Sequence, residues 1–184
     1  MFKFLSIFFI LFFPNIVFSS IKENIVSKMQ VTNILSFDFI QTIDEKKENG
    51  SCIIKYPKKM YCEYTGSNKK IIVSNGKSVV IKYKNSGNYY IYSLKKTPFE
   101  LLLNKNFLIS QIKNLKSKLI DNKFIAFKIT ENNNEISIFF NKKNFNLVGW
   151  QTEDIYQNLS ITFISSIEIN PKIDDKIFIL PIND

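Results

Sequence analysis

The sequence predicts a mainly β protein with helices (α+β), built on a strongly curved antiparallel sheet. From Ser36 onward, apolar and polar residues alternate with a period of two in short segments, and Gly, Asn, Ser and Pro turns separate these segments. About ten such strands are more than a flat open sheet holds comfortably, so the sheet should curve toward a barrel. We expect one helix before the sheet and a helical insert near residues 97–114.

Residues 1–19 do not fit that sheet. A short positive start precedes an apolar run that Pro14 interrupts, and small Ser19 or Ser20 stands where a signal peptidase would cut. This pattern predicts a secretory signal peptide, followed by a single domain over residues 20–184. The alternative is an uncleaved membrane anchor, which the short, broken run disfavours. No Cys follows the run, so we expect an exported protein without its own lipid anchor.

The first helix has a complete start signal. Ser20 and Glu23 have the spacing of a capping box, and the helix should end before Ser36. Its apolar stripe consists of Ile21, Ile25, Val26 and Met29.

Short strands follow the first helix. "SFDFIQTI" places Phe37 and Phe39 on one face and Ile40 on the other. "SNG" (74–76), between two β-branched runs, predicts a hairpin turn. Further strands are expected in "GSCIIKYPKKMYCEYTG", "GNYYIYSL", "FIAFKIT", "EISIFFN", "LVGWQTED", "LSITFISSIEI" and the terminal "KIFILPI".

The helical insert starts at "TPFELLL". Thr97 is placed to cap, Pro98 suits the first helical position, and Glu100 has capping-box spacing. The following "FLISQIKNLKSKL" either continues the insert as a second helical piece or begins the next strand. The insert has little polar face, because its apolar residues are Phe99, Leu101, Leu102, Leu103, Phe107 and Leu108.

Composition excludes several functions. All 25 basic residues are Lys, so the bidentate Arg fork used in nucleic-acid recognition is absent. The excess of Lys over Arg fits AT-rich codon usage, so the formal charge of +9 favours a solvated lysine-rich surface over the alternative of a specific anionic partner. The chain has no His, no Gly-rich phosphate loop and no nucleophile elbow. Asp and Glu form no recognisable catalytic or metal-binding pattern. We therefore expect neither an enzyme, nor a cofactor, nor a metal site, nor a nucleic-acid partner.

Several motifs follow one another behind the N-terminal helix: "FIQ" (39–41), "GSCIIKYPKKMYCEY", "VSNGK" (73–77), "YSLKKTPFELLL", "LVGWQTED" (147–154) and "FILP" (178–181). In this order they resemble the family of periplasmic outer-membrane lipoprotein carriers, LolA, and most closely its α-proteobacterial form.

The resemblance implies an unclosed β-barrel over an apolar cavity, with the helical insert as its lid. It implies a monomeric periplasmic carrier that takes acylated lipoproteins from an inner-membrane ABC transporter and delivers them to an outer-membrane receptor or to the outer membrane itself. An envelope sensor on the same half-barrel is the alternative. The cavity-wall candidates are Cys52, Ile54, Met60, Cys62 and Tyr64, and the lid candidates are Pro98, Phe99, Leu101, Leu102, Leu103, Phe107 and Leu108.

Two positions depart from the family pattern. The family carries an Arg before the Pro corresponding to Pro57, where it holds the lid closed; here Tyr56 occupies that position, and its single hydroxyl is the candidate latch. Cys52 and Cys62 lie symmetrically about Pro57, so they form either a disulfide across two strands or two small apolar residues of the cavity wall.

Overall fold

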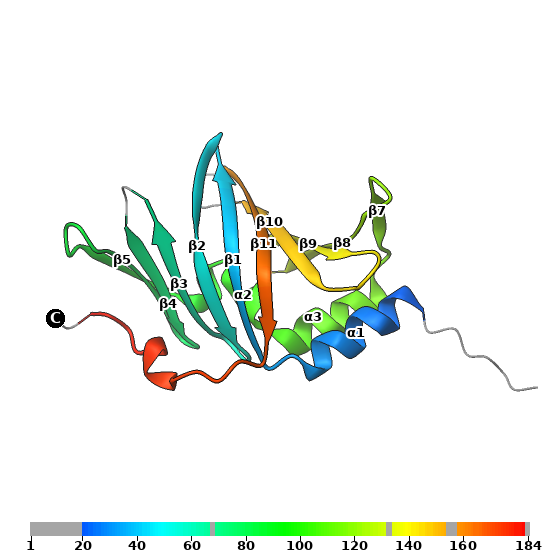
Figure 1. Cartoon of the computed structure of the whole chain (residues 1–184), viewed down its shortest axis with the longest axis horizontal. Coiled ribbons are helices and arrows are strands. Elements are labelled where there is room, and N and C mark those ends of the chain that lie inside the picture. Colours follow the sequence, from blue (N-terminus) through cyan, green and yellow to red (C-terminus); the bar gives the residue numbers. More distant parts are fainter. Residues whose placement is uncertain (1–19, 67–68, 132–133, 154–157, 183–184) are drawn as a thin grey trace, which may run out of the picture.

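The computed structural model describes residues 20–66, 69–131, 134–153 and 158–182. The predicted signal peptide and Asp154 of "LVGWQTED" lie outside these residues. A single curved sheet runs through the molecule, and the helices α1, α2 and α3 lie on one side of it (Figure 1). No helix among the described residues is long and apolar enough to cross a membrane.

The elements follow one another as a long meander with a helical insert. The helices are α1 (Ile21–Val31), α2 (Phe99–Leu103) and α3 (Lys105–Asn114), with short 3₁₀ turns η1 (Leu94–Lys96) and η2 (Asp175–Phe178). The strands are β1 (Ile34–Ile43), β2 (Lys46–Lys55), β3 (Lys59–Thr65), β4 (Lys70–Asn75), β5 (Ser78–Tyr83), β6 (Tyr89–Ser93), β7 (Lys118–Ile120), β8 (Phe124–Glu131), β9 (Asn134–Asn141), β10 (Leu147–Glu153) and β11 (Leu159–Ile169).

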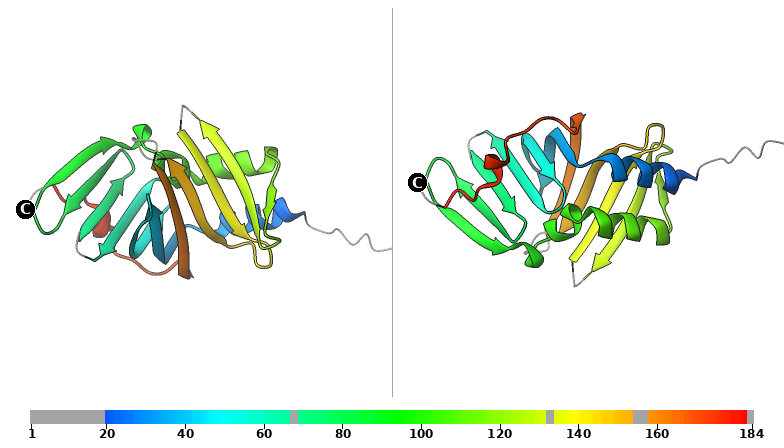
Figure 2. Two further views of the ribbon diagram at one scale, coloured as in Figure 1. Left: turned by 90° about the horizontal axis from the view of Figure 1, so that it is seen from above. Right: turned by 90° about the horizontal axis from the view of Figure 1, so that it is seen from below.

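The eleven strands of the described residues belong to one antiparallel sheet with the order β6-β5-β4-β3-β2-β1-β11-β10-β9-β8-β7. The first and last strands meet in its middle, where β1 pairs with both β2 and β11. The edge strands β6 and β7 do not pair with each other, so the barrel stays unclosed, and Figure 2 shows the resulting curvature. The predicted fold class, a curved antiparallel sheet with helices, is confirmed.

Helix α1 begins as its sequence predicts. The Ser20 hydroxyl accepts from the Glu23 N–H at 3.2 Å, and the Glu23 carboxylate accepts from the Ser20 N–H at 2.6 Å. Ile25 and Val26 are buried against the sheet, and the helix ends at Val31. The capping box is therefore confirmed.

Alternation along the strands gives the sheet an inner face, which the helices cover. Phe37 and Phe39 of β1 are buried on this face, whereas Ile40 points outward and is 55% exposed. Gly50 of β2 lies opposite Phe39, and a Cβ at Gly50 would come within 2.9 Å of the Phe39 ring and 2.0 Å of the Glu63 carbonyl oxygen. Glycine is thus the residue that lets this ring cross the strand.

Strand β11 reverses the usual burial pattern. Its polar Ser160 and Thr162 are buried on the inner face, whereas Leu159 and Phe163 point outward and are exposed. The inner face is therefore not uniformly apolar at this end of β1 and β11, and Gln41 fills the space between the hydroxyls.

Two sequence predictions are wrong. "KIFILPI" forms no strand: its first three residues belong to η2, and buried Phe178 packs this segment onto β3 and β4. The Asp174 carboxylate caps the turn. Thr97 and Glu100 form no capping box, because the Thr97 hydroxyl donates to the Leu94 carbonyl at 2.9 Å and closes η1 instead. The carboxylate of Glu100 is used elsewhere.

Candidate functional site

The predicted wall residues lie together on the inner face of β2 and β3. Cys52 is the register partner of Cys62, and Ile54 is the partner of Met60. All five predicted residues are buried, including Tyr64 further along β3. The predicted alternation is therefore what places them on one surface.

The other half of the inner wall was missed from the sequence. It comes from β8 and β9, whose "FIAFKIT" and "EISIFFN" segments carry the alternation that could have identified it. Phe127 and Phe140 pack edge to face with ring centroids 6.1 Å apart. The buried residues of this half are Ile125, Phe127, Ile129, Ile136, Ile138 and Phe140.

Helices α2 and α3, hereafter the helical cover, fill the space between the two halves. Asn104 separates the two helices, and its side-chain oxygen accepts from the Phe107 N–H to start α3. Pro98, Phe99 and Phe107 are partly buried. The buried residues of the cover are Leu101, Leu102, Leu103, Leu108 and Ile112, the last of which the sequence prediction missed.

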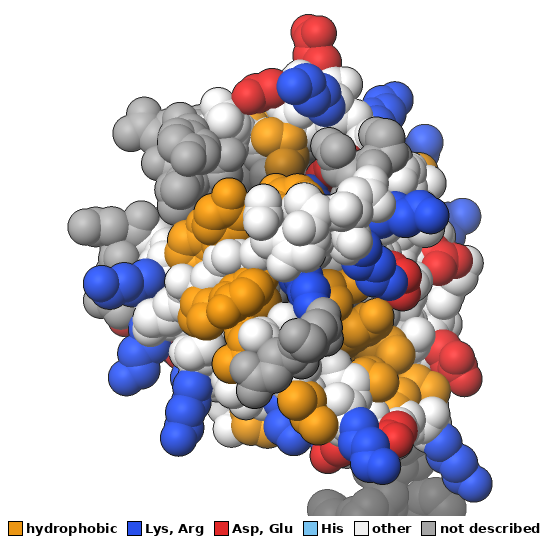
Figure 3. Space-filling view, turned by 90° about the vertical axis from the view of Figure 1, so that its left-hand side faces the viewer, with side chains coloured by type: hydrophobic (Ala, Val, Ile, Leu, Met, Phe, Trp, Pro, Cys, Tyr) orange, Lys and Arg blue, Asp and Glu red, His pale blue; other side chains and the backbone are white. Residues whose placement is uncertain are grey.

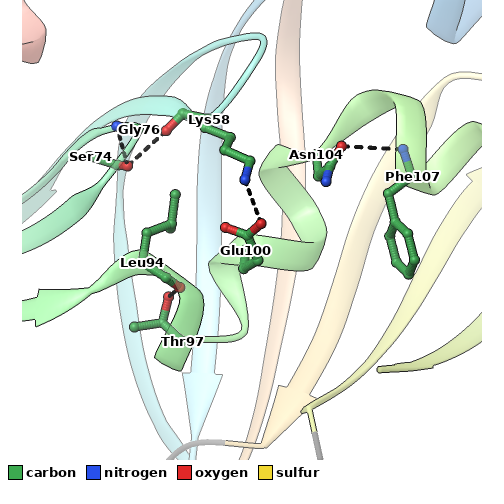
Figure 4. Close-up of polar contacts among 8 residues, drawn as sticks. All are labelled: Lys58, Ser74, Gly76, Leu94, Thr97, Glu100, Asn104 and Phe107. Atoms are coloured by element: carbon green, nitrogen blue, oxygen red, sulfur yellow. Dashed lines mark hydrogen bonds and ion pairs between the residues drawn. The ribbon is translucent and has the colours of Figure 1, made fainter. Parts of the chain in front are cut away.

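Lys58, in the turn between β2 and β3, makes two contacts with α2, and Figure 4 shows the one with Glu100. Its N–H donates to the Leu103 carbonyl at 3.0 Å, and its ammonium pairs with the Glu100 carboxylate at 2.6 Å. The Ser74 hydroxyl donates to the Lys58 carbonyl at 2.7 Å, which fixes the turn. One carboxylate oxygen of Glu100 is used in this pair, and the other is buried without a partner among the described residues.

Lys105, the first residue of α3, holds the second part of the cover. Its ammonium donates to the carbonyl oxygens of Gln30 and Thr32 at 3.2 and 2.9 Å, and to the Asn33 side-chain oxygen at 3.1 Å. These acceptors lie at the C-terminal end of α1, where the helix dipole favours a cation. All three donors of the ammonium are thereby used.

The same contacts set the direction of the two long helices. At the other end, the Lys22 ammonium of α1 donates to the Lys113 carbonyl of α3 at 3.1 Å. The start of each helix thus meets the end of the other, so α1 and α3 run antiparallel, side by side across the sheet (Figure 2).

Tyr56 contributes its ring and not its hydroxyl. The Lys105 ammonium lies 5.7 Å from the ring centroid, within the range of a cation–π contact. Among the described residues the hydroxyl makes no hydrogen bond to the cover, so the prediction that the Tyr56 hydroxyl latches the cover is wrong. The contact is instead made by a charge on the cover and the aromatic ring of Tyr56. Burial raises the pKa of Tyr56 to about 12, so the phenol is neutral at physiological pH.

The apolar cavity beneath the cover is small. A cavity of about 50 Å³ lies between α1, α3 and the ends of β9 to β11, and its lining includes Tyr56, Leu102, Leu108 and Phe140. Pockets that hold small ligands usually measure roughly 300–1,000 Å³. The leucines of the cover therefore occupy the volume that the curved sheet encloses.

A polar cluster lies on the inner face at the end of β1 opposite the cavity. The Tyr64 hydroxyl donates to the Gln41 side-chain oxygen at 2.9 Å, and the Gln41 amide donates to the hydroxyls of Ser160 and Thr162 at 3.1 and 3.3 Å. Burial raises the pKa of Tyr64, so its hydroxyl remains a donor. Among the described residues no group of His, Cys, Asp or Glu could hold a metal ion.

Cys52 and Cys62 form a disulfide between paired positions of β2 and β3, with Cα atoms 4.1 Å apart. Of the two alternatives that the sequence left open, the structure has the bonded one. The bond joins two wall strands beside the turn that carries Lys58.

Reducing this disulfide should lower the free energy of unfolding by about 2–3 kcal/mol, because the open chain regains the entropy of a short loop. The two cysteines are 10 residues apart. Urea unfolding of the oxidised and the reduced protein measures the difference. A Cys52→Ala, Cys62→Ala double variant is the control, since reductant should leave its midpoint unchanged. Equal midpoints for the oxidised and reduced wild-type protein would contradict the prediction.

The fold and this site define a class of protein: an unclosed β half-barrel whose apolar inner face is filled by a separately anchored helical cover. The family model described as outer membrane lipoprotein carrier protein LolA matches residues 30–180. The chain belongs to the LolA family, whose members bind lipoproteins.

Solved structures resemble the chain at low sequence identity. An uncharacterized conserved protein from Thermus thermophilus has a TM-score of 0.51 and 7% identity, over 85% of this chain and 90% of that one. A LolA superfamily protein from Nitrosomonas europaea has a TM-score of 0.45 and 10% identity, over 87% and 98%. MucB in the Pseudomonas aeruginosa MucA/MucB complex has a TM-score of 0.45 and 7% identity, over 84% and 58%. No curated protein sequence matches the chain.

Proposed function

We propose that this protein is a non-enzymatic periplasmic carrier of acylated lipoproteins. It accepts them from an inner-membrane ABC transporter, shields their acyl chains against the inner face of the half-barrel, and delivers them to the outer membrane. The observation that carries the proposal is the apolar inner wall filled by a helical cover with its own polar anchors. Membership of the LolA family supports it.

The proposal assigns the cover the role of a lid. Burying acyl chain yields about 0.8 kcal/mol per CH₂ group, so a few methylene groups already give useful affinity. An acyl chain does not fit the remaining cavity of about 50 Å³. The chains must therefore displace Leu102 and Leu108 from the wall. Because they replace apolar protein surface and not water, the net affinity stays moderate and the cargo can be released.

The anchors are suited to a lid that moves. Lys58 holds α2 and Lys105 holds α3, and both contacts are polar, partly exposed and formed with groups outside the cover. When such contacts break, water replaces the lost partners, so opening costs roughly a few kcal/mol and not the full strength of the hydrogen bonds. The leucines between the anchors supply the apolar contact in the empty state.

A release assay tests the proposal. The purified protein is incubated with inner-membrane vesicles that contain an acylated lipoprotein and its transporter, and the soluble fraction is analysed for lipoprotein. We expect release as a complex of carrier and cargo. The matched control is the same lipoprotein with its acylated cysteine replaced, which should give no complex. Absence of any complex with the native cargo would overturn the proposal.

A further inference from the structure

The hairpin of β5 and β6, at one end of the sheet, exposes an unusual set of side chains. Every residue of β6 is exposed, and Tyr90 and Ile91 are 54% and 51% exposed. Along β6, Tyr90 and Tyr92 share the inner face with the register partners Ile81 and Val79, and Ile91 lies on the outer face. The strand therefore exposes tyrosine rings on its inner face and an isoleucine on its outer face.

The sequence of this hairpin is strongly biased. Residues 77–96 contain four of the eight tyrosines of the chain, five lysines and no Asp or Glu. AT-rich codon usage explains lysine in place of arginine, but it does not explain the absence of acidic residues, since the chain has 16 of them elsewhere. Glu63 of β3 brings a carboxylate to the edge of this region, where it pairs with Lys84.

Tyrosine and lysine together are suited to the surface of a lipid bilayer. Tyrosine rings are enriched at the level of the lipid headgroups, where the ring meets apolar surface and the hydroxyl meets water. Lysines near a bilayer are attracted by anionic headgroups, and stable attachment needs both an apolar and an electrostatic contribution. In Figure 3, which views this end of the molecule, hydrophobic side chains lie near the centre, and lysines together with several acidic side chains lie around them.

We propose that the β5–β6 hairpin docks the protein on the anionic surface of a lipid bilayer, through the tyrosines and Ile91 of β6 and the flanking lysines. An anionic bilayer is the partner that charge complementarity favours, because the charged side chains of the hairpin itself are all lysines. The inference goes beyond the proposed function, since it concerns the empty protein and a membrane without cargo. The hairpin lies at the end of the sheet far from β7, and neither α1 nor α3 covers it (Figure 1).

Vesicle cosedimentation tests this surface. The protein, expressed from its full sequence and purified as the cell processes it, is mixed with vesicles of phosphatidylcholine alone or with added phosphatidylglycerol. We expect binding that requires phosphatidylglycerol and weakens as salt is raised. A Lys95→Glu, Lys96→Glu variant should bind these vesicles at least about tenfold more weakly than the wild-type protein. A Tyr90→Ser, Ile91→Ser variant should also lose binding, although its charge is unchanged.

The matched control is Lys116→Glu, Lys118→Glu, which makes the same change of net charge with exposed lysines beside β7. It should bind like the wild-type protein. Equal loss in the control would show that net charge alone causes binding, and unchanged binding of both hairpin variants would exclude this surface; either result overturns the proposal. The assay contains neither lipoprotein nor transporter, so its outcome is independent of the release assay.

Discussion

Replacing Lys105 with methionine should loosen the helical cover while the strands of the half-barrel stay intact. The Lys105 ammonium donates three hydrogen bonds to the C-terminal end of α1 and the adjoining loop, and it faces the Tyr56 ring. A hydrogen bond to a charged group contributes about 1.5–3 kcal/mol, and a cation at a helix C-terminus adds about 0.3–1 kcal/mol. Because Lys105 is partly exposed, we expect a net loss of about 2 kcal/mol in the free energy that holds the cover.

Hydrogen exchange measures this loss locally. In Lys105→Met, the amides of α2 and α3 should exchange about 30-fold faster, whereas the amides of β1 and β2 should keep their protection. Lys113→Met is the matched control, because Lys113 lies on the same helix, its side chain is exposed, and only its backbone carbonyl bonds to α1. Unchanged exchange in Lys105→Met would show that Lys105 does not hold the cover closed. Faster exchange throughout the sheet would show that the cover does not open separately.

The anchors could not be predicted from the sequence, although the leucines of the cover could. The apolar run "PFELLL" within a β-rich chain predicts a helix whose apolar side chains pack against the sheet. The burial of Leu101, Leu102 and Leu103 follows from that run. Lys105 meets its acceptors on residues more than 70 positions away in the chain. Lys58 looks like any other of the 25 lysines until the β2–β3 turn is folded against α2.

Alternation along the sequence correctly predicted strands in which one face is buried and the other is exposed to solvent, as in β1. Prediction failed where a local pattern competes with tertiary structure. "KIFILPI" has a strand-like composition, but the sheet positions beside β1 are already taken by β2 and β11, so the segment packs across β3 and β4 through Phe178. In β11 the alternation holds, but Leu159 and Phe163 lie on the exposed face. The hydroxyls of Ser160 and Thr162 lie on the inner face, where both accept from the Gln41 amide.

Placing a carboxylate in the centre of the cover should show whether the cover is a movable lid or part of a permanent core. Leu102 is buried beneath the cover, and a buried ionised aspartate costs more than most domains can tolerate. If the cover opens separately, Leu102→Asp exposes the carboxylate by opening, and the loss of stability cannot exceed the free energy that held the cover closed. We expect a loss of about 2–4 kcal/mol in the free energy of unfolding, with the strands retained.

This upper limit makes a second substitution decisive. Leu103 is equally buried on the same helix. Once the cover is open, Leu103→Asp costs nothing further, so the double variant Leu102→Asp, Leu103→Asp should unfold in urea within about 0.5 kcal/mol of the single variant. Ile138→Asp is the contrasting control, because β9 is paired with both β8 and β10 and cannot leave the sheet without unfolding it. If the two aspartates in the cover add their costs, or if Leu102→Asp unfolds the sheet as Ile138→Asp should, α2 is part of the core and the lid role fails.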